Sequence, residues 1–264
     1  MLTSIRGLVA ATLIAATGLV AMPAQADQTA PPAEFTVTGS AAVVSQYRFR
    51  GLSQSDNLPA VQGSITLNHA SGLYVGTWGS SASNKTSPIN IGGTEIDVFG
   101  GYSKTISGIT LDGGVYGYLY PGATAGNYYE LYGSLAKTLG PAKAKVGVNF
   151  APAQKVFNYN FSSPTRSNTY VYGELSGGVP KTPFSVHTHL GYSSGGFDFG
   201  RDYLDYSAGV SYTWKALTLD ASIVGTDLSR NALVNTFGPV GSFGNEQAFR
   251  QGKTVGVVSL TASF

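Results

Sequence analysis

A two-residue alternation of apolar and polar side chains is the feature that most limits what this chain can fold into. Between Thr36 and Arg50, odd positions are mostly apolar or small, and even positions carry Thr, Ser, Gln and two Arg. The alternation returns between Val61 and Asn68, after the turn-rich segment 51–59, which we expect to be an exposed loop. Because successive side chains of a strand point to opposite faces, each run predicts a strand with one apolar and one polar wall. One such hairpin is marginal in water, so further strands must complete it.

The N-terminal segment has the features of a secretory signal peptide. Met1 to Arg6 carries one positive charge, 7–20 is apolar or small, and Ala24-Gln25-Ala26 has the small-x-small pattern of a cleavage site. We therefore expect residues 1–26 to be removed and residues 27–35 to form a short lead. The alternative is an N-terminal membrane anchor, but the apolar run is short for a spanning helix. The sequence thus predicts export.

Composition narrows the destination of the exported chain. Only 11% of the residues are charged, where an ordinary soluble domain has about 25%, while Gly (35), Tyr (16) and Phe (13) are abundant. After the signal peptide, no stretch offers the roughly 18 apolar residues that a transmembrane helix requires. Strands with one lipid-facing and one polar face produce such a composition.

Composition also argues against several kinds of site. The chain has no Cys, so neither a disulfide framework nor a thiolate metal site can form. Lys plus Arg (16) nearly balance Asp plus Glu (14), and nothing in that balance indicates nucleic-acid binding. His187 and His189 share one predicted strand face, but two His alone are too few for a structural metal site. We therefore predict no cofactor and no metal.

Candidate strands follow one another to the C-terminus, and the connections between them alternate long and short. The predicted strands cover residues 36–50, 61–68, 73–79, 94–106, 109–120, 127–137, 143–150, 170–177, 184–193, 204–214, 217–226 and 253–264. An even strand number with short periplasmic turns and long extracellular loops is typical of outer-membrane barrels. We predict an all-β fold, a single transmembrane antiparallel up-and-down β-barrel of about 12 strands over residues 36–264. The first strand should pair with the last, because an open edge in lipid is costly.

Aromatic residues near the predicted strand ends are expected to form girdles at the two membrane interfaces. The residues assigned to them are Phe49, Tyr129 and Phe150 on one side and Tyr102, Phe184, Trp214 and Phe264 on the other. The alternating run that ends at Phe264 resembles the C-terminal signal that the barrel-assembly machinery recognises. Outer-membrane lipid and this machinery are therefore the expected partners, besides small solutes. The faces of the third strand stay ambiguous, because Leu73 and Val75 compete with Tyr74 and Trp78.

The first hairpin carries a resemblance to a known family. Its residues are SQYRFRGLSQSD (45–56) followed by PAVQG (59–63). This segment is similar to the opening motif of the TorF-like family of outer-membrane porins, and the layout of signal peptide plus barrel agrees along nearly the whole chain. The resemblance implies an outer-membrane location in a Gram-negative bacterium and a pore. It transfers no substrate and no catalytic residue.

Charged side chains on the predicted inner wall form one candidate site. We expect Arg48 and Arg50 near the extracellular end of the first strand, opposite acidic residues at a similar height. These acidic residues are Glu95, Asp97, Glu130 and Asp205. Opposed acidic and basic walls create a transverse field that orients polar solutes and filters ions, so one hypothesis is a selective constriction. The alternative is that the same residues form ion pairs that only fill a narrow lumen.

Tyrosines gather on the inner faces of three predicted strands. They are Tyr116, Tyr118, Tyr120, Tyr128, Tyr132, Tyr170 and Tyr172. Aromatic planes with hydroxyl tips can stack on sugar rings and bond them, so an aromatic path for sugars is one interpretation. The alternative is that these tyrosines occupy lumen volume and hydrogen-bond the charged groups.

The sequence favours a porin-like channel for passive diffusion of small polar or ionic solutes. A second class is a non-conducting adhesin or structural barrel, whose activity would lie in the long loops 151–168 and 227–252. A third class is an outer-membrane hydrolase with a Ser-His pair on its outer wall. Both His residues of strand 184–193 face inward, and the chain has no nucleophile elbow, so we predict no enzymatic activity.

Overall fold

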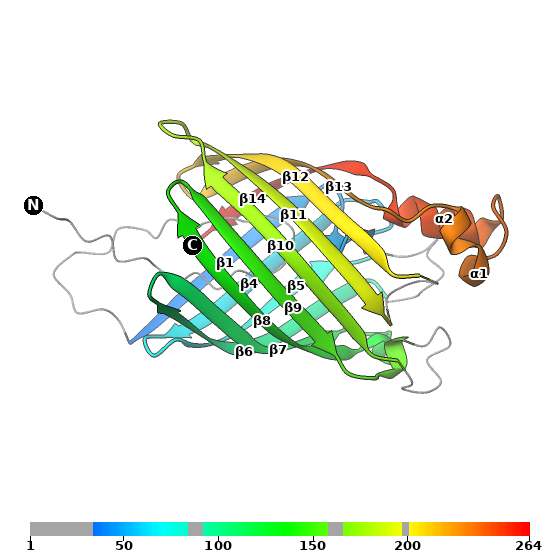
Figure 1. Ribbon diagram of the computed structural model, residues 1–264, viewed down its shortest axis with the longest axis horizontal. Helices are drawn as coiled ribbons and strands as arrows, with labels where there is room; N and C mark the ends of the chain where they lie inside the picture. The colour runs from blue at the N-terminus through cyan, green and yellow to red at the C-terminus, as the bar shows by residue number, and fades with distance from the viewer. Residues whose placement is uncertain (1–33, 84–91, 158–165, 197–200) are drawn as a thin grey trace, which may run out of the picture.

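The computed structural model describes residues 34–83, 92–157, 166–196 and 201–264, in which twelve strands form a closed antiparallel barrel (Figure 1). The barrel strands are β1 (Phe35–Val44), β4 (Ala60–His69), β5 (Leu73–Ser81), β6 (Thr94–Ile106), β7 (Ile109–Leu119), β8 (Tyr128–Leu139), β9 (Ala142–Ala151), β10 (Asn168–Gly178), β11 (Phe184–Gly195), β12 (Tyr203–Trp214), β13 (Leu217–Thr226) and β14 (Val255–Ser263). The predicted all-β barrel is confirmed. The predicted signal peptide, 1–26, and most of the lead lie outside the described residues.

The barrel closes where β1 meets β14. β1 pairs with β14 from Ser40↔Ser263 to Val44↔Ser259, and with β4 along its whole length. This is the predicted pairing of the first strand with the last, and it closes the barrel, as the cost of an open sheet edge in lipid requires. The C-terminus lies at the end of the barrel where the connections are short, and helices lie at the opposite, long-loop end (Figure 1).

The outer surface of the barrel is an apolar belt. Alternate side chains point outward, as at Ile65 and Leu190, which are 49% and 56% exposed. Such a surface is stable only against lipid. Tyr129 and Phe150 lie exposed near the long-loop end, and the girdle residues Tyr102, Phe184, Trp214 and Phe264 are exposed near the short-turn end.

The faces of the third barrel strand, β5, are now defined. Tyr74 and Trp78 point into the barrel and are buried, whereas Leu73 and Val75 are each 57% exposed on the outside. In the β4–β5 register, Trp78 lies opposite Ser64, which faces the lumen. Directly paired residues share a face of the sheet, so Trp78 faces the lumen as well.

The prediction that the first strand runs to Arg50 is wrong. β1 ends at Val44, and residues 45–59, called the inward loop below, fold into the barrel. The loop contains a two-stranded sheet of β2 (Arg48–Phe49) and β3 (Leu52–Ser53). Backbone φ angles of +46° at Arg50 and +77° at Gly51 reverse the chain between these strands, and a residue that adopts positive φ ends a regular strand.

Two smaller predictions fail for the same reason. The segment 51–59, expected to be an exposed loop, is largely buried: Leu52 is 8% exposed and Ser55 is 2% exposed. Phe49, assigned to a lipid-facing girdle, lies inside the barrel with its ring 5.6 Å from that of Tyr118. The alternation of Tyr47 and Phe49 with arginines thus reflects packing inside the lumen and not a lipid boundary.

Helices cover the long-loop end of the barrel. The connection 227–252 contains η3 (Asn231–Leu233), α1 (Val234–Phe237) and α2 (Phe243–Gly252), and shorter η1 (Thr124–Gly126) and η2 (Lys155–Phe157) lie in two other connections. Leu52 of the inward loop packs into a buried cluster with Leu233 of η3 and Phe237 of α1. The helical connection therefore lies directly over the inward loop. In the described part of the chain, no helix is long and apolar enough to cross a membrane.

A charge placed on the outer belt should destabilise the barrel strongly. We expect Ile65→Arg, at mid-strand on the lipid face, to lower the free energy of unfolding in lipid vesicles by about 2–4 kcal/mol. Ser64→Arg is the matched control, since Ser64 is the adjacent residue and points into the lumen, where it bonds Ser40 (Oγ to Oγ, 2.8 Å). Urea titration in vesicles measures both variants, and equal losses would contradict a lipid-facing belt.

Candidate functional site: the inward loop in the lumen

The inward loop crosses the lumen and reaches walls on different sides of the barrel. The Tyr47 hydroxyl donates to Glu95 Oε1 of β6 at 3.0 Å, and Tyr203 of β12 donates to the Arg50 carbonyl oxygen at 3.3 Å. Between them, Arg50 binds Glu130 of β8. Because these contacts lie on strands far apart around the barrel, the loop obstructs the long-loop half of the lumen.

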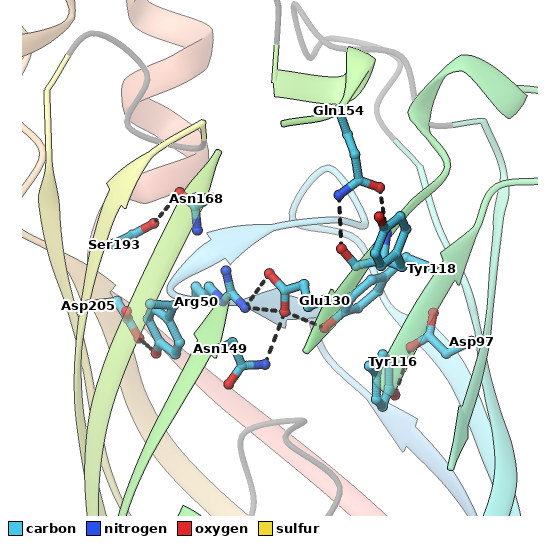
Figure 2. Close-up of polar contacts among 12 residues, drawn as sticks. Arg50, Asp97, Tyr116, Tyr118, Glu130, Asn149, Gln154, Asn168, Ser193 and Asp205 are labelled. Carbon is cyan, nitrogen blue, oxygen red and sulfur yellow. Dashed lines mark hydrogen bonds and ion pairs between the residues drawn. The ribbon is translucent and has the colours of Figure 1, made fainter. Parts of the chain in front are cut away.

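The Arg50–Glu130 ion pair is the central contact of the site (Figure 2). Arg50 Nη2 donates to both carboxylate oxygens of Glu130, at 2.8 and 2.6 Å, and the two side chains are 3% and 0% exposed. Glu130 also accepts from the Asn149 amide at 3.0 Å and from the Tyr118 hydroxyl at 3.3 Å. A buried charge pair is tolerated when its remaining hydrogen-bonding capacity is satisfied in this way.

Aromatic rings enclose the Arg50 guanidinium. Its Cζ lies 4.1 Å from the centroid of the Tyr170 ring and 4.8 Å from that of Phe49. A guanidinium over an aromatic face gains electrostatic stabilisation, and the gain increases where water is excluded. The positive charge of Arg50 is thus stabilised by the Glu130 carboxylate and by the faces of two aromatic rings.

Arg48 has a different environment, close to the helical cover. Its guanidinium donates to Gly51 O at 3.0 Å, to Asn57 Oδ1 at 2.6 Å, and to the carbonyl oxygen of Gln251 in the last turn of α2. A cation suits the carbonyl groups at a helix C-terminus. A second ion pair, Asp56 with Arg250 of α2, joins the loop to the same helix.

The predicted acidic residues all line the inner wall near the inward loop. Besides Glu130, Glu95 accepts from Tyr47 of the loop, Asp97 accepts from Tyr116 at 2.9 Å, and Asp205 accepts from Tyr170 at 3.1 Å. The two arginines, expected on the wall of the first strand, project from the inward loop instead. The structure therefore pairs Arg50 with Glu130, whereas Arg48 contacts Gly51, Asn57 and Gln251 and none of the four predicted acidic residues.

All seven predicted tyrosines point into the barrel. Tyr118, Tyr120, Tyr128, Tyr170 and Tyr172 are buried, and Tyr116 and Tyr132 are half-buried. The rings of Tyr118 and Tyr128 stack with centroids 4.2 Å apart, directly beside the Arg50–Glu130 pair. Three of the seven donate hydroxyl hydrogen bonds to buried carboxylates of the wall: Tyr116 to Asp97, Tyr118 to Glu130 and Tyr170 to Asp205.

The charges of the inner wall are predominantly negative. In the described strands, the inward-facing carboxylates are Glu95, Asp97, Asp112, Glu130, Glu174, Asp205 and Asp220, and the inward-facing lysines are Lys143 and Lys145. His187 Nε2 lies 2.7 Å from Asp220 Oδ2, and His189 Nε2 lies 3.2 Å from Asp205 Oδ1. No three His, Asp or Glu side chains are grouped to hold a metal ion in the part of the chain that is described.

Sequence comparison places the chain in a bacterial family. A family model described as "Bacterial protein of unknown function (Gcw_chp)" matches residues 27–264. The chain belongs to the Gcw_chp family. No curated protein matches the sequence. The family description names no activity. Membership therefore establishes the family of the chain, and evidence for its function must come from the residues inside the barrel.

Structure comparison agrees with the barrel fold. The NanC porin matches with a TM-score of 0.55 at 10% identity, over 87% of this chain and 99% of that chain. An outer-membrane channel from Pseudomonas putida matches with a TM-score of 0.47 at 12% identity, over 92% of this chain and 99% of that chain. At such identity the likeness to the NanC porin establishes the shared fold of this Gcw_chp protein.

Several residues of the site escaped the sequence-based prediction. Tyr47, Asn149 and the Asp56–Arg250 pair all hold or surround the inward loop, and none was singled out. One signal was available: the predicted first strand, 36–50, is longer than the about 9–11 residues that cross a membrane at a tilt. The excess indicates that the last part of this run leaves the barrel wall.

Proposed function

We propose that this Gcw_chp protein is an outer-membrane channel of the TorF-like type for passive diffusion of small polar or ionic solutes in a Gram-negative bacterium. In the conformation described, the inward loop closes the channel. The observation that carries the proposal is that the inward loop lies inside a barrel whose strands do not depend on it for their pairing. The loop's contacts with β6, β8 and β12 each involve a side chain, and its backbone bonds to the rest of the barrel include those of Ser45 (N to Val258 O, 2.8 Å) and Gln54 (O from Ser83 N, 2.9 Å). The strands that flank it already pair from Val44↔Ala60 onward without it. Because the barrel strands pair without the inward loop, the loop can leave the lumen while the barrel stays folded, and the pore would then be open.

The orientation follows the usual asymmetry of such barrels. Short turns lie on the periplasmic side and long loops outside. The inward loop and its helical cover then face the extracellular medium. The C-terminal strand ending at Phe264 is the proposed contact for the assembly machinery, and removal of residues 1–26 would precede insertion.

Cations are the proposed preferred ions of the open channel. Carboxylates outnumber lysines on the inner wall, and the guanidinium that offsets Glu130 belongs to the inward loop. When the loop leaves the lumen, that positive charge leaves with it. Rings of acidic side chains favour cations in a pore. Glu95, Asp97, Glu130 and Asp205 are therefore the proposed selectivity residues, with Arg50 as their removable counter-ion.

The other two classes have weaker support. A non-conducting adhesin would act through its outer loops, and the contacts of the 227–252 connection with the inward loop favour a role in closing the barrel instead. A hydrolase would need a Ser-His pair on the outer wall. His187 and His189 instead face the lumen and contact Asp220 and Asp205. We therefore propose no enzymatic role.

Reversal potentials in planar bilayers test the proposal. The informative protein is a loop-replacement variant in which residues 45–59 are exchanged for Asn-Gly, a two-residue turn suited to joining paired strands. Under a KCl gradient, we expect its potential to show K⁺ preferred over Cl⁻ by about fivefold or more, because of the acidic wall. Replacing Glu130 by Gln in this variant should reduce the preference. Anion preference would contradict the assignment of these carboxylates, and absence of any channel together with phospholipid hydrolysis would favour the enzyme class.

A further inference from the structure

Four exposed lysines lie at the short-turn end of the barrel, where the C-terminus also lies (Figure 1). Lys104 and Lys137 are near the ends of β6 and β8, whereas Lys181 lies in the β10–β11 turn and Lys215 in the β12–β13 turn. We call these four residues the basic rim. They place an exposed ammonium group in or close to four different short turns.

The charges of the basic rim have no carboxylate partner within the described part of the chain. None of its four lysines forms an ion pair with a described residue, and the exposed carboxylate of Glu34 at this end lies 3.3 Å from His69. At the long-loop end, by contrast, Arg201, Arg230 and Arg250 each pair with a carboxylate. The two ends of the barrel therefore differ, and the short-turn end carries uncompensated positive charge.

Lys104 and Lys137 point outward at the margin of the apolar belt. Lys104 pairs with Leu111 of β7, which is 42% exposed on the outer surface. Lys137 pairs with Ile109 of the same strand, which is 39% exposed. Since directly paired residues share a face of the sheet, the two lysines flank β7 on its lipid-facing side. A lysine in this position is stable when its long side chain carries the ammonium group to the polar headgroups.

Lys215 and Lys181 lie beside a residue of the aromatic girdle. Lys215 Nζ is 5.1 Å from the centroid of the Trp214 ring, and Trp214 is 56% exposed. The turn that contains Lys181 is bonded to the same strand, since Thr213 N donates to Pro183 O at 3.0 Å. Tryptophan at the edge of a lipid-facing belt lies at the level of the headgroups. Both halves of the basic rim are therefore next to lipid headgroups.

We infer that the basic rim binds the phosphate groups of anionic phospholipids. Charge and position support the same partner, because the ammonium groups lack carboxylate partners and border a surface that faces lipid. Each lysine near an anionic membrane surface strengthens the attraction about fivefold. With the short turns on the periplasmic side, as proposed above, these lipids belong to the periplasmic leaflet. Their binding does not require the barrel to conduct.

Fluorescence quenching by brominated lipids tests this assignment, because Trp214 reports the lipid next to Lys215. The full chain is placed in vesicles of equal parts phosphatidylglycerol, which is anionic, and phosphatidylcholine, which is zwitterionic, with bromine on the acyl chains of one lipid at a time. The other tryptophan, Trp78, is buried inside the barrel and supplies a background that is the same for both lipids. We expect a preference for phosphatidylglycerol of about fivefold or more. Equal quenching by the two lipids would overturn the assignment.

Two double variants make the result specific. Lys181→Gln, Lys215→Gln should reduce the preference to about one, because it removes the charges next to Trp214. Lys155→Gln, Lys253→Gln is the matched control, since both of these lysines are exposed and lie at the long-loop end. The control should keep the preference of the wild type. A preference that survives in the first variant, or one that both variants lose equally, would contradict the inference.

Salt dependence of the wild-type protein gives a second test that needs no variant. Added KCl screens exposed charges, so the preference for phosphatidylglycerol should fall as the salt concentration rises. A preference that does not change with salt would show that the ammonium groups are not its cause. The outcomes also separate this inference from the proposed function. If the lipid preference is absent while the loop-replacement variant conducts, this inference is wrong and the channel proposal stands; if the preference is present while that variant does not conduct, the channel proposal is wrong instead.

Discussion

Glu130→Gln is expected to release the inward loop from the lumen. The substitution keeps the shape of the side chain and removes the charge that compensates Arg50, whose side chain is 3% exposed. Removing one partner of a buried ion pair costs about 3–5 kcal/mol, because the other charge remains buried without compensation. The barrel can avoid this cost by letting the loop swing out, since its strands pair without the loop. We therefore expect the Glu130→Gln variant to release the inward loop under conditions in which the barrel is still folded.

Limited trypsin digestion measures this release. Arg48 and Arg50 are trypsin sites, and both are buried while the loop lies inside the barrel. Since cleavage follows the population of the open form when opening is fast, we expect the cleavage rate in Glu130→Gln to rise on the order of 100-fold. The fluorescence of Trp78, whose ring is 5.2 Å from that of Tyr47, should change in parallel.

Two further variants make the result specific. Glu246→Gln removes the same charge from the exposed Arg230–Glu246 pair, where the expected effect is within about 1 kcal/mol. The double variant Arg50→Met, Glu130→Met removes both buried charges and should restore most of the protection, measured at Arg48. Similar cleavage rates in Glu130→Gln and Glu246→Gln would show that the buried pair does not hold the loop.

The barrel could be predicted because the pattern that specifies it, the alternation of apolar and polar residues, lies within each strand. In β6, Ile96 and Val98 alternate with Glu95 and Asp97, and the lipid and lumen environments require that pattern independently of distant contacts. The same reasoning extends to the seam at Phe264, because closure is obligatory in lipid. Strand number, the faces of the strands other than β5, and the pairing of the first and last strands therefore follow from the sequence.

The inward loop could not be predicted on the same grounds. Tyr47 and Phe49 continue the alternation of β1, but they face aromatic residues of the lumen and not lipid. The Arg50–Glu130 contact joins residues far apart in the sequence, and it exists only once the loop has turned inward. The sequence predicts Arg50 and Glu130 in one constriction but places Arg50 on the first strand of the wall. Because Arg50 lies on the inward loop instead, its positive charge can leave the lumen together with the loop.

Helix α2 was missed for a related reason. Its N-terminal cap is present, since Ser242 accepts from the Asn245 amide, but Gly244 and the shortness of the helix weaken the local signal. The helical connection is stabilised by packing of Leu228, Leu233 and Phe237 against Leu52 of the inward loop. Tertiary packing of this kind is not visible in a local pattern.

Replacing the inward loop is expected to have the largest effect on conductance. The loop fills the long-loop half of the lumen, and the exchange of residues 45–59 for Asn-Gly leaves the Val44↔Ala60 pair as the last rung of the hairpin. Asn-Gly provides the positive φ angles that a two-residue turn between such strands needs. The exchange should therefore open the pore without altering the register of β1 and β4.

Single-channel conductance of this variant beside the wild-type protein tests the central claim most directly. We expect stable openings on the order of tenfold larger in mean conductance than those of the wild type, because the obstruction is gone while the polar wall remains. An Arg201→Ala variant, which alters an exposed ion pair with Asp227 at the same end of the barrel, should conduct like the wild type. Equal conductance of the wild type and the loop-replacement variant, with both correctly folded, would contradict the claim that the inward loop closes this barrel.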